Sequence, residues 1–344
     1  MRVWESDLRL KSPAGNGLVS YSTFLGQWST DPLKIQRVIA KCNLMNPVLI
    51  RTPESVDLFM HPVNLPGAEG EKARNKVLRD RTLLIRLYIV AILAFPLFPL
   101  YFQKFSSLFW ATEVTFIVIA IYIAFDRHTV LQFRDKLEER GRYYGWLFLK
   151  SRPYVAMLAA IFIVSGICQF GFGGRNFVDQ WALDYSKAMD ESWRFVTGPL
   201  IHGRLAHFLT NLTMGLGVAA IAGPSMQRYF LPVFLMGGIL SFLGDFAYQS
   251  LFPREAYDGL VGTSGSIAAL IGCLLALCLR YRHSYPYQMW VTILTFVFVS
   301  LIAGAIFMSS VSLTCHMFGL MAGAAMSLLI PDYLADPEKK AGTG

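Results

Sequence analysis

The chain has 344 residues, of which 54% are hydrophobic and only 16% are charged. Soluble domains carry roughly 25% charged residues, so this composition argues against an ordinary soluble protein and favours one embedded in a membrane. The formal net charge is +8, but most basic residues lie beside apolar stretches, where such charges orient a membrane protein. We therefore expect the lipid bilayer as a partner and no nucleic acid.

Eight apolar stretches follow one another along the chain, and each approaches the ~20 residues that a bilayer-spanning helix needs. They cover residues 84–102, 107–125, 153–173, 203–222, 229–250, 262–279, 288–307 and 310–330. The first two are separated by a very short segment and predict a tight hairpin, which could instead lie at the membrane interface. The sequence thus predicts an all-α polytopic membrane protein with about eight spans.

The charges between these stretches predict their orientation, because cytoplasmic loops carry an excess of Lys and Arg. Residues 1–86 hold 13 basic and 8 acidic residues, residues 126–152 hold seven and four, and residues 174–192 hold two and four. The N-terminus and residues 126–152 are therefore expected on the cytoplasmic side and residues 174–192 on the opposite side. Eight spans then return the C-terminus to the cytoplasm.

This layout divides the chain into five segments. They are a cytoplasmic N-terminal region over residues 1–82, an extra transmembrane hairpin over 83–126, a basic cytoplasmic linker over 127–152, a six-span core over 153–331 and a cytoplasmic tail over 332–344. The N-terminal region contains one helical-looking piece, residues 32–44, and the sequence does not indicate a role for it.

Polar residues in the segment 191–212, which leads into the stretch 203–222, point to function, since polar groups inside a membrane are costly. His202, His207 and Asn211 fall here, and the last two are four residues apart, so they share one face of a helix. The alternative is that they join helices by hydrogen bonds. The two histidines are five apart and have no neighbouring carboxylate, so we predict no metal site and no cofactor.

A Gly-Thr-Ser-Gly sequence opens the stretch 262–279, with Gly262 and Gly265 around Ser264. Glycine allows a close backbone approach and unusual dihedral angles. A serine at a helix start lies beside free backbone N–H groups, which could stabilise an oxyanion formed when the serine attacks a carbonyl. The alternative is a membrane serine that only bonds a backbone carbonyl of its own helix.

The last apolar stretch contains His316, followed by a GxxxG pattern at Gly319 and Gly323 that would let another helix come close. A histidine is the usual base for a serine nucleophile, and the alternative is a structural histidine beside a packing motif. In the expected topology His207, Ser264 and His316 all lie in the outer halves of their spans. They therefore predict a serine hydrolase with a Ser–His dyad in a wet cavity, open to the non-cytoplasmic side.

This set of motifs resembles the rhomboid intramembrane serine proteases. The resemblance covers about residues 153–330 and rests on Trp193, Arg194, His202, His207, Asn211, Gly262, Ser264, Gly265, His316, Gly319 and Gly323. It implies a six-helix rhomboid core preceded by the extra hairpin. It also implies that residues 174–194 form a partly submerged loop that anchors the fold, with Arg194 in its internal hydrogen bonds.

The resemblance further implies an activity, a serine endopeptidase that acts on membrane proteins. Ser264 would be the nucleophile and His316 the general base, and the oxyanion would be stabilised by His207, Asn211 and the backbone N–H of Ser264. Substrates of the family are single-span membrane proteins that are cut in or near the span and enter past a mobile gate at the fifth core span. Transmembrane proteins are therefore the expected substrates.

Two positions depart from the family pattern. Ala268 stands four residues after Ser264, where an aromatic ring usually packs on the catalytic histidine. The imidazole would then be held less firmly, or by another ring such as a Phe of residues 288–307. Gln227 replaces a Glu that is common after the second core span, which would weaken a cytoplasmic anchoring interaction.

Two other functions stay open beside the protease. One is a catalytically silent rhomboid-like protein that binds or escorts membrane clients, which the departure at Ala268 favours, whereas the presence of both Ser264 and His316 disfavours it. The other is a channel or transporter, but the polar residues cluster in the outer halves of their spans and form no continuous polar lane.

Overall fold

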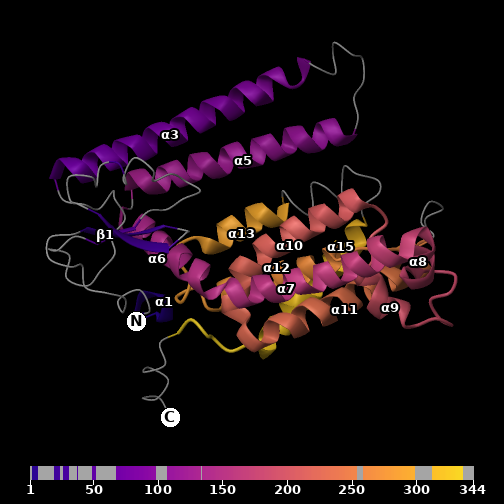
Figure 1. Ribbon diagram of the computed structural model, residues 1–344. Helices are drawn as coiled ribbons and strands as arrows, with labels where there is room; N and C mark the ends of the chain where they lie inside the picture. The colour runs from indigo at the N-terminus through magenta and orange to yellow at the C-terminus, as the bar shows by residue number, and fades with distance from the viewer. Residues whose placement is uncertain are drawn as a thin grey trace. The chain divides into compact units, whose positions relative to one another are not determined.

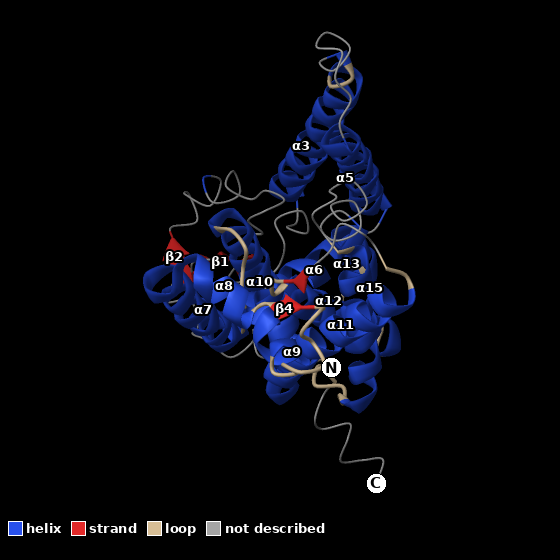
Figure 2. Ribbon diagram, turned by 90° about the vertical axis from the view of Figure 1, so that its right-hand side faces the viewer, coloured by secondary structure: helices blue, strands red, loops and turns tan. Residues whose placement is uncertain are grey.

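The computed structural model describes residues 2–6, 19–23, 26–30, 37, 49–51, 67–97, 107–132, 134–253, 259–298 and 312–335. The chain divides into two compact units. The N-terminal unit comprises Met1–Leu149, Arg282–Thr295 and Leu334–Gly344, and the core unit comprises Lys150–Tyr281 and Phe296–Tyr333. Helices make up most of the described residues of both units, with a few short strands (Figure 2).

The N-terminal unit begins with the short helix α1 (Val3–Ser6) and contains a small antiparallel sheet. Its strands are β1 (Val19–Thr23), β2 (Gly26–Thr30) and β3 (Leu49–Arg51), in the order β2-β1-β3. The expectation of an all-helical chain misses this sheet, which is built from residues such as Val19, Tyr21 and Trp28 that favour strands. The helical-looking piece at 32–44 lies, apart from Arg37, outside the described residues.

Two long helices of the N-terminal unit, α3 (Gly67–Ala94) and α5 (Ser107–Gln132), pack side by side (Figure 1). The ring of Phe116 meets those of Tyr88 and Phe95 edge to face, with centroids 5.9 and 5.6 Å apart. The helix α3 starts well before the predicted apolar stretch at 84, because residues 67–83 are rich in Ala, Glu, Lys and Arg, which favour helices.

A buried ion-pair cluster joins three helices of this unit. Asp126 of α5 pairs with Arg81 of α3 and with Arg140 of α6 (Arg134–Lys150). Both Asp126 and Arg81 are buried, so the carboxylate compensates two guanidinium groups that would otherwise be costly to bury. The predicted linker 127–152 thus continues α5 and then forms a helix of its own.

The N-terminal unit also holds the start of α13 (Met289–Val297) and the turn before it. The indole N–H of the fully buried Trp4 donates to the backbone oxygen of Ser284 at 2.9 Å. The hydroxyl groups of Tyr122 and Thr292 are 3.2 Å apart. These contacts join residues 284–292 to α1 and α5.

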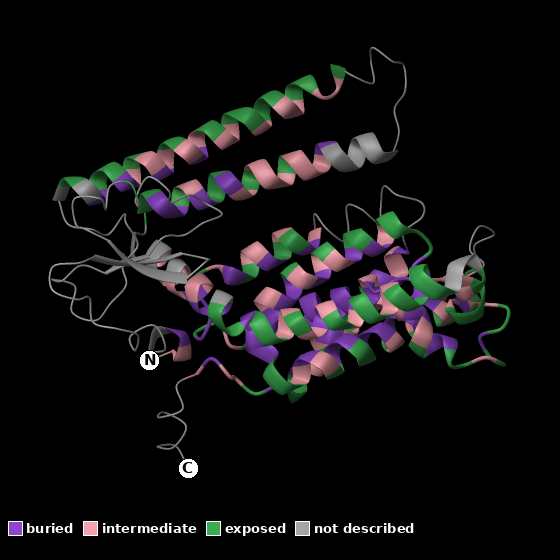
Figure 3. Ribbon diagram, viewed as in Figure 1, coloured by how far each residue is buried: buried purple, intermediate pink, exposed green. Residues whose placement is uncertain are grey.

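The described part of the core unit is a bundle of helices. In chain order its elements are α7 (Arg152–Gly166), the π-helical segment η4 (Ile167–Gly173), α8 (Gly174–Trp181), β4 (Leu183–Asp184), α9 (Arg194–Thr197), α10 (Leu205–Met226), α11 (Phe230–Leu251), β5 (Gly259–Leu260), α12 (Ser264–Arg280) and α15 (Leu313–Met326). The helix α12 packs against α10, α11 and α15, and α10 packs against α7. The helix α12 is accordingly the most deeply buried helix of the bundle (Figure 3).

Among the residues that the structure describes, three stretches of helix are long and apolar enough to cross a membrane by length and composition. They are Glu113–Gln132, Arg152–Phe172 and Leu205–Leu251, and the last contains both α10 and α11. Shorter apolar helices cover Ser264–Arg280 and Leu313–Leu329. Residues 98–106 and 299–311 of the expected spans lie outside the described residues. The protein is an integral membrane protein with several helical spans.

Small residues bring α12 and α15 into backbone contact, as the GxxxG pattern predicts. A Cβ added at Gly319 would overlap the backbone oxygen of Gly265, and one added at Gly323 would overlap that of Ala269. In the other direction, a Cβ at Gly272 would overlap the backbone oxygen of Leu320. The two helix axes therefore approach about as closely as two helices can.

Candidate active site

The chain enters α12 through a turn that backbone hydrogen bonds hold in place. The strands β4 and β5 pair antiparallel, with Leu183 opposite Leu260. Two residues after β5, the N–H of Gly262 donates to the backbone oxygen of Gly198 at 3.3 Å. These bonds fix the segment that leads into Ser264, the first residue of α12.

Gly262 lies directly against two polar side chains of α10. Its φ of +115° is a backbone conformation that favours glycine. A Cβ added there would lie 2.6 Å from Cε1 of His207 and 3.3 Å from Nδ2 of Asn211. The structure therefore brings together Gly262, His207 and Asn211, which the sequence singles out on two different segments.

His202 adds a third polar group to this cluster from the segment before α10. Its Nε2 lies 3.1 Å from Nδ2 of Asn211 and 3.4 Å from the hydroxyl oxygen of Thr263. Burial, and then the neighbouring His207, lowers the pKa of His202 to about 3. The imidazole is therefore neutral at physiological pH, and its Nε2 can accept a hydrogen bond from the amide of Asn211.

Gln169 holds the backbone of His202 from the π-helical segment η4. The N–H of His202 donates to Oε1 of Gln169 at 2.9 Å, and Nε2 of Gln169 donates to the backbone oxygen of His202. Sequence reasoning missed this buried residue. The available signal is an amide within the apolar stretch 153–173, and π-helical segments often occur at functional sites.

Ser264 is half-buried, whereas Gly262, Thr263 and Gly265 around it are buried. It stands at the N-terminal end of α12, where the first backbone N–H groups have no partner within the helix and the helix dipole is positive. A negatively charged oxygen bound there would meet donors from the backbone. The segment that carries the serine is thus chemically suited to stabilise an anion.

His316 lies in the first turn of α15 and is buried. The preceding residue, Cys315, contacts α12, since a Cβ added at Gly265 would lie 3.0 Å from its Sγ. The first turns of α12 and α15, which carry Ser264 and His316, therefore meet through Gly265 and Cys315. Each of these contacting residues is the immediate neighbour of one member of the predicted dyad.

Ala268, the small residue that departs from the family pattern, lies where α12 and α15 approach each other closely. Ala268 is fully buried, and a Cβ added at Gly319 would lie 3.1 Å from its Cβ. The expectation that a Phe of 288–307 holds the imidazole falls in part on residues outside the described ranges. The other departure, Gln227, follows the end of α10 with a φ of 48°.

Arg194 holds together residues 174–204 between η4 and α10, which we call the outer segment because the sequence predicts residues 174–192 on the non-cytoplasmic side. This buried side chain donates to the backbone oxygens of Asp179 at 2.9 Å and Ala182 at 2.7 Å, and it pairs with Glu191. Its neighbour Trp193 is 48% exposed. The internal hydrogen bonds that the resemblance implies for Arg194 are therefore present in this segment.

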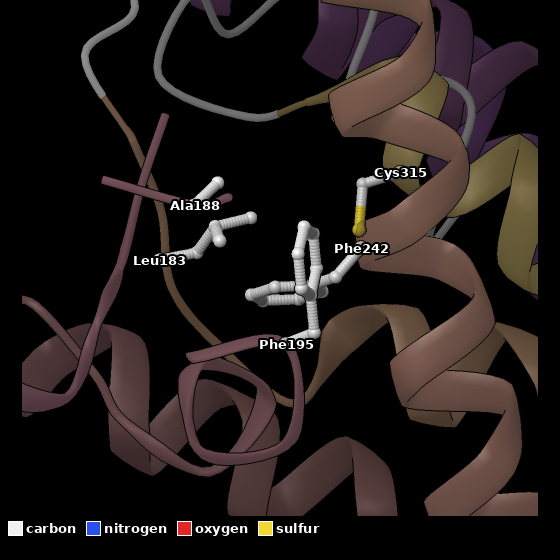
Figure 4. Close-up of a cluster of buried hydrophobic side chains, with 5 residues drawn as sticks. All are labelled: Leu183, Ala188, Phe195, Phe242 and Cys315. Atoms are coloured by element: carbon white, nitrogen blue, oxygen red, sulfur yellow. The ribbon is translucent and has the colours of Figure 1, made fainter. Parts of the chain in front are cut away.

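A cluster of buried apolar side chains joins the outer segment to the helices beside the site. It comprises Leu183, Ala188, Phe195, Phe242 and Cys315 (Figure 4). Three of these residues come from the outer segment, one from α11 and one from the first turn of α15 (Figure 4). The residue before His316 is therefore packed on one side by the outer segment and on the other by α12.

A buried carboxylate, Asp245 of α11, lies at the same end of the bundle and was also missed by the sequence analysis. It accepts hydrogen bonds from the hydroxyls of Ser312, Thr314 and Tyr185. An acidic residue in the apolar stretch 229–250 is the signal that could have identified it. Within the part of the chain that the structure describes, no three His, Cys, Asp or Glu residues are grouped as ligands for a metal.

Comparison with known proteins agrees with this architecture. Residues 189–332 match the family model of the Rhomboid domain. The match begins in the outer segment, just before Trp193, and ends shortly after α15, so it includes His207, Ser264 and His316. A search of curated proteins gave no match. Residues 189–332 are therefore similar to the Rhomboid domain, as the resemblance found in the sequence implies.

Proposed function

We propose that the protein is an intramembrane serine endopeptidase that cuts other membrane proteins in or near their transmembrane segments. The rhomboid family includes proteases and inactive members, so the proposal depends on the site. The observation that carries it is the position of Ser264 between two groups of side chains. On one side Gly262 contacts His207 and Asn211, and on the other Gly265 contacts the turn that carries His316.

In the proposed reaction, Ser264 Oγ attacks the carbonyl carbon of the substrate peptide bond while His316 accepts the hydroxyl proton. The carbonyl oxygen becomes an oxyanion, to which His207, Asn211 and the backbone N–H of Ser264 donate hydrogen bonds. His316 then gives its proton to the leaving nitrogen, and the C–N bond breaks. Water hydrolyses the ester left on Ser264 by the same route and restores the free hydroxyl.

The contacts among the supporting residues suit this chemistry. Because Asn211 donates one amide hydrogen to the neutral His202, its second amide hydrogen remains for the space beside Gly262. We further propose that the termini are cytoplasmic, that the site opens to the non-cytoplasmic side, and that the substrates are transmembrane proteins. The charge distribution between the apolar stretches supports this orientation.

A fluorophosphonate probe tests the proposal, because it bonds covalently to an activated serine and releases fluoride. Purified wild-type protein should be labelled and should cleave a model transmembrane substrate, whereas Ser264→Ala and His316→Ala should do neither while remaining folded. Ser266→Ala is the matched control, since it removes a second hydroxyl from the same helical turn and should leave labelling intact. Cleavage by purified Ser264→Ala would refute the proposed nucleophile.

The second candidate is a silent rhomboid-like protein that binds membrane clients, and the small side chain of Ala268 beside Gly319 is the observation that favours it. The same experiment separates the two functions. Folded wild-type protein whose Ser264 reacts no faster than that of His316→Ala would support the binding role and contradict the protease.

A further inference from the structure

Asp245 is a fully buried carboxylate that three hydroxyl groups surround. The hydroxyl of Ser312 donates to its Oδ1 at 2.6 Å, that of Thr314 donates to the same oxygen, and that of Tyr185 donates to Oδ2. A buried carboxylate is costly unless donors satisfy it, and hydrogen bonds to a charged acceptor are stronger than neutral ones. The four side chains therefore form one connected polar group.

One of these donors, Ser312, sets the beginning of α15. Ser312 is the N-cap residue of this helix, and its hydroxyl oxygen accepts the backbone N–H of Cys315 at 3.2 Å. Its carbonyl oxygen accepts the backbone N–H of His316 at 3.3 Å. The carboxylate of Asp245 is thus linked through the capping serine to the turn that carries His316, and a negative group at a helix N-terminus also interacts favourably with the helix dipole.

The same face of α11 reaches the beginning of α12. Ser241 lies one turn before Asp245. A Cβ added at Gly265 would overlap the hydroxyl of Ser241. The hydroxyl of Ser241 donates to the backbone oxygen of Gly238 at 2.7 Å, which fixes its own position. One face of α11 therefore contacts the two turns that contain Ser264 and His316.

We infer that Asp245 is a positioning residue that holds the first turn of α15 against α12 and so keeps His316 oriented towards Ser264. It acts through the hydroxyls of Ser312 and Thr314 rather than on the substrate. The orientation of His316 for catalysis rests on the proposed function. The anchoring of the first turn of α15 rests only on the hydrogen bonds to Asp245. Removing the carboxylate takes away the acceptor that the three hydroxyls share and leaves the start of α15 without its anchor.

The first test compares Asp245→Ala and Asp245→Asn with Asp190→Ala, which removes an exposed acid of the outer segment. Per molecule of folded protein, Asp245→Ala should react with the fluorophosphonate at least tenfold more slowly, with a matching fall in kcat and little change in KM. Asp245→Asn should lose less, because its amide oxygen still accepts hydroxyl hydrogens. Asp190→Ala should behave as wild type.

The second test follows the thiol of Cys315, which is buried within the anchored turn. If Asp245 holds this turn, Asp245→Ala should increase modification of Cys315 by N-ethylmaleimide at least fivefold, measured by peptide mass spectrometry. Should Asp245→Ala fail to fold, Asp245→Asn and Thr314→Val replace it in both tests. This readout does not need an active serine, so it separates the inference from the proposed function.

The outcomes then divide as follows. Slower labelling together with greater Cys315 modification supports the inference. Unlabelled wild-type protein with greater Cys315 modification in the variant overturns the proposed function and supports the holding of α15. Wild-type rates of both labelling and Cys315 modification in folded Asp245→Ala overturn the inference.

Discussion

Two helix pairs of this protein meet in different ways. In the core unit, α12 and α15 are so close that a Cβ added at Gly272 or Gly323 would overlap a backbone oxygen of the facing helix. In the N-terminal unit, α3 and α5 meet through large side chains, with the ring of Phe116 against those of Tyr88 and Phe95. Rings can change rotamer to accommodate a change, whereas backbone atoms in contact cannot. The pair that carries the proposed dyad is therefore the one with the less adjustable geometry.

The largest effect should come from breaking the backbone contact with Gly323→Val. Its Cβ would overlap the carbonyl oxygen of Ala269, and only movement of a helix could relieve the overlap. We expect a loss of about 4 kcal/mol in the free energy of unfolding, the upper end for one substitution, and no labelling of Ser264. Thermal unfolding in detergent, followed by tryptophan fluorescence, measures the loss.

Gly217→Ala in α10 is the control for that substitution. An added Cβ there meets no atom of the described residues within 4 Å, so the change should be neutral or should stabilise by up to about 1 kcal/mol through helix propensity. Equal stability of Gly323→Val and Gly217→Ala would contradict the close approach of α12 and α15.

A smaller effect on stability, and none on the site, should follow from Asp126→Ala in the N-terminal unit. The substitution leaves the buried Arg81 and its neighbour Arg140 without their carboxylate, which should cost about 3 kcal/mol. Chemical unfolding should report this loss, while the labelling rate of Ser264 in folded protein stays within twofold of wild type.

The exposed ion pair on α3 provides the matched comparison for Asp126. Asp80 pairs with Lys76 at 3.0 Å, but both side chains are partly in solvent, so Asp80→Ala should cost less than about 1 kcal/mol. If the two substitutions cost the same, the buried ion-pair cluster does not hold the three helices together.

Apart from the control substitutions, the smallest effect should come from Phe116→Leu, which removes the central ring of the α3–α5 contact but keeps an apolar side chain. Loss of the two edge-to-face contacts should cost about 1 kcal/mol, with unchanged labelling of Ser264. Phe125→Leu on the same helix is the control, because that side chain is exposed and its replacement should cost less. A loss as large as that of Gly323→Val would mean that ring packing is no more adjustable than backbone contact.

Much of the core unit could be predicted because its signals are local. Small residues four apart at Gly319 and Gly323 predict a close helix pair, and His207 and Asn211 predict one polar helix face. The structure contains the close pair and brings that face against Gly262. The catalytic roles of Ser264 and His316 stay predictions that the labelling experiment tests.

Other features escaped because they depend on partners far away in the sequence. The role of Asp245 becomes visible only once Ser312 and Tyr185 lie beside it, and that of Gln169 only once the backbone of His202 does. The sheet of β1, β2 and β3 was missed because an apolar-stretch search does not detect short strands with alternating polar residues.

The π-helical segment η4 has a further consequence for the first core helix. A π-helical turn corresponds to an α-helix that has accepted one additional residue, so the chain after Gly173 is advanced by one position relative to an uninterrupted helix. The side chain that clamps the His202 backbone, Gln169, lies within this wider turn. The position of Gln169 beside His202 thus depends on the extra residue in the π-helical turn as well as on the identity of the side chain.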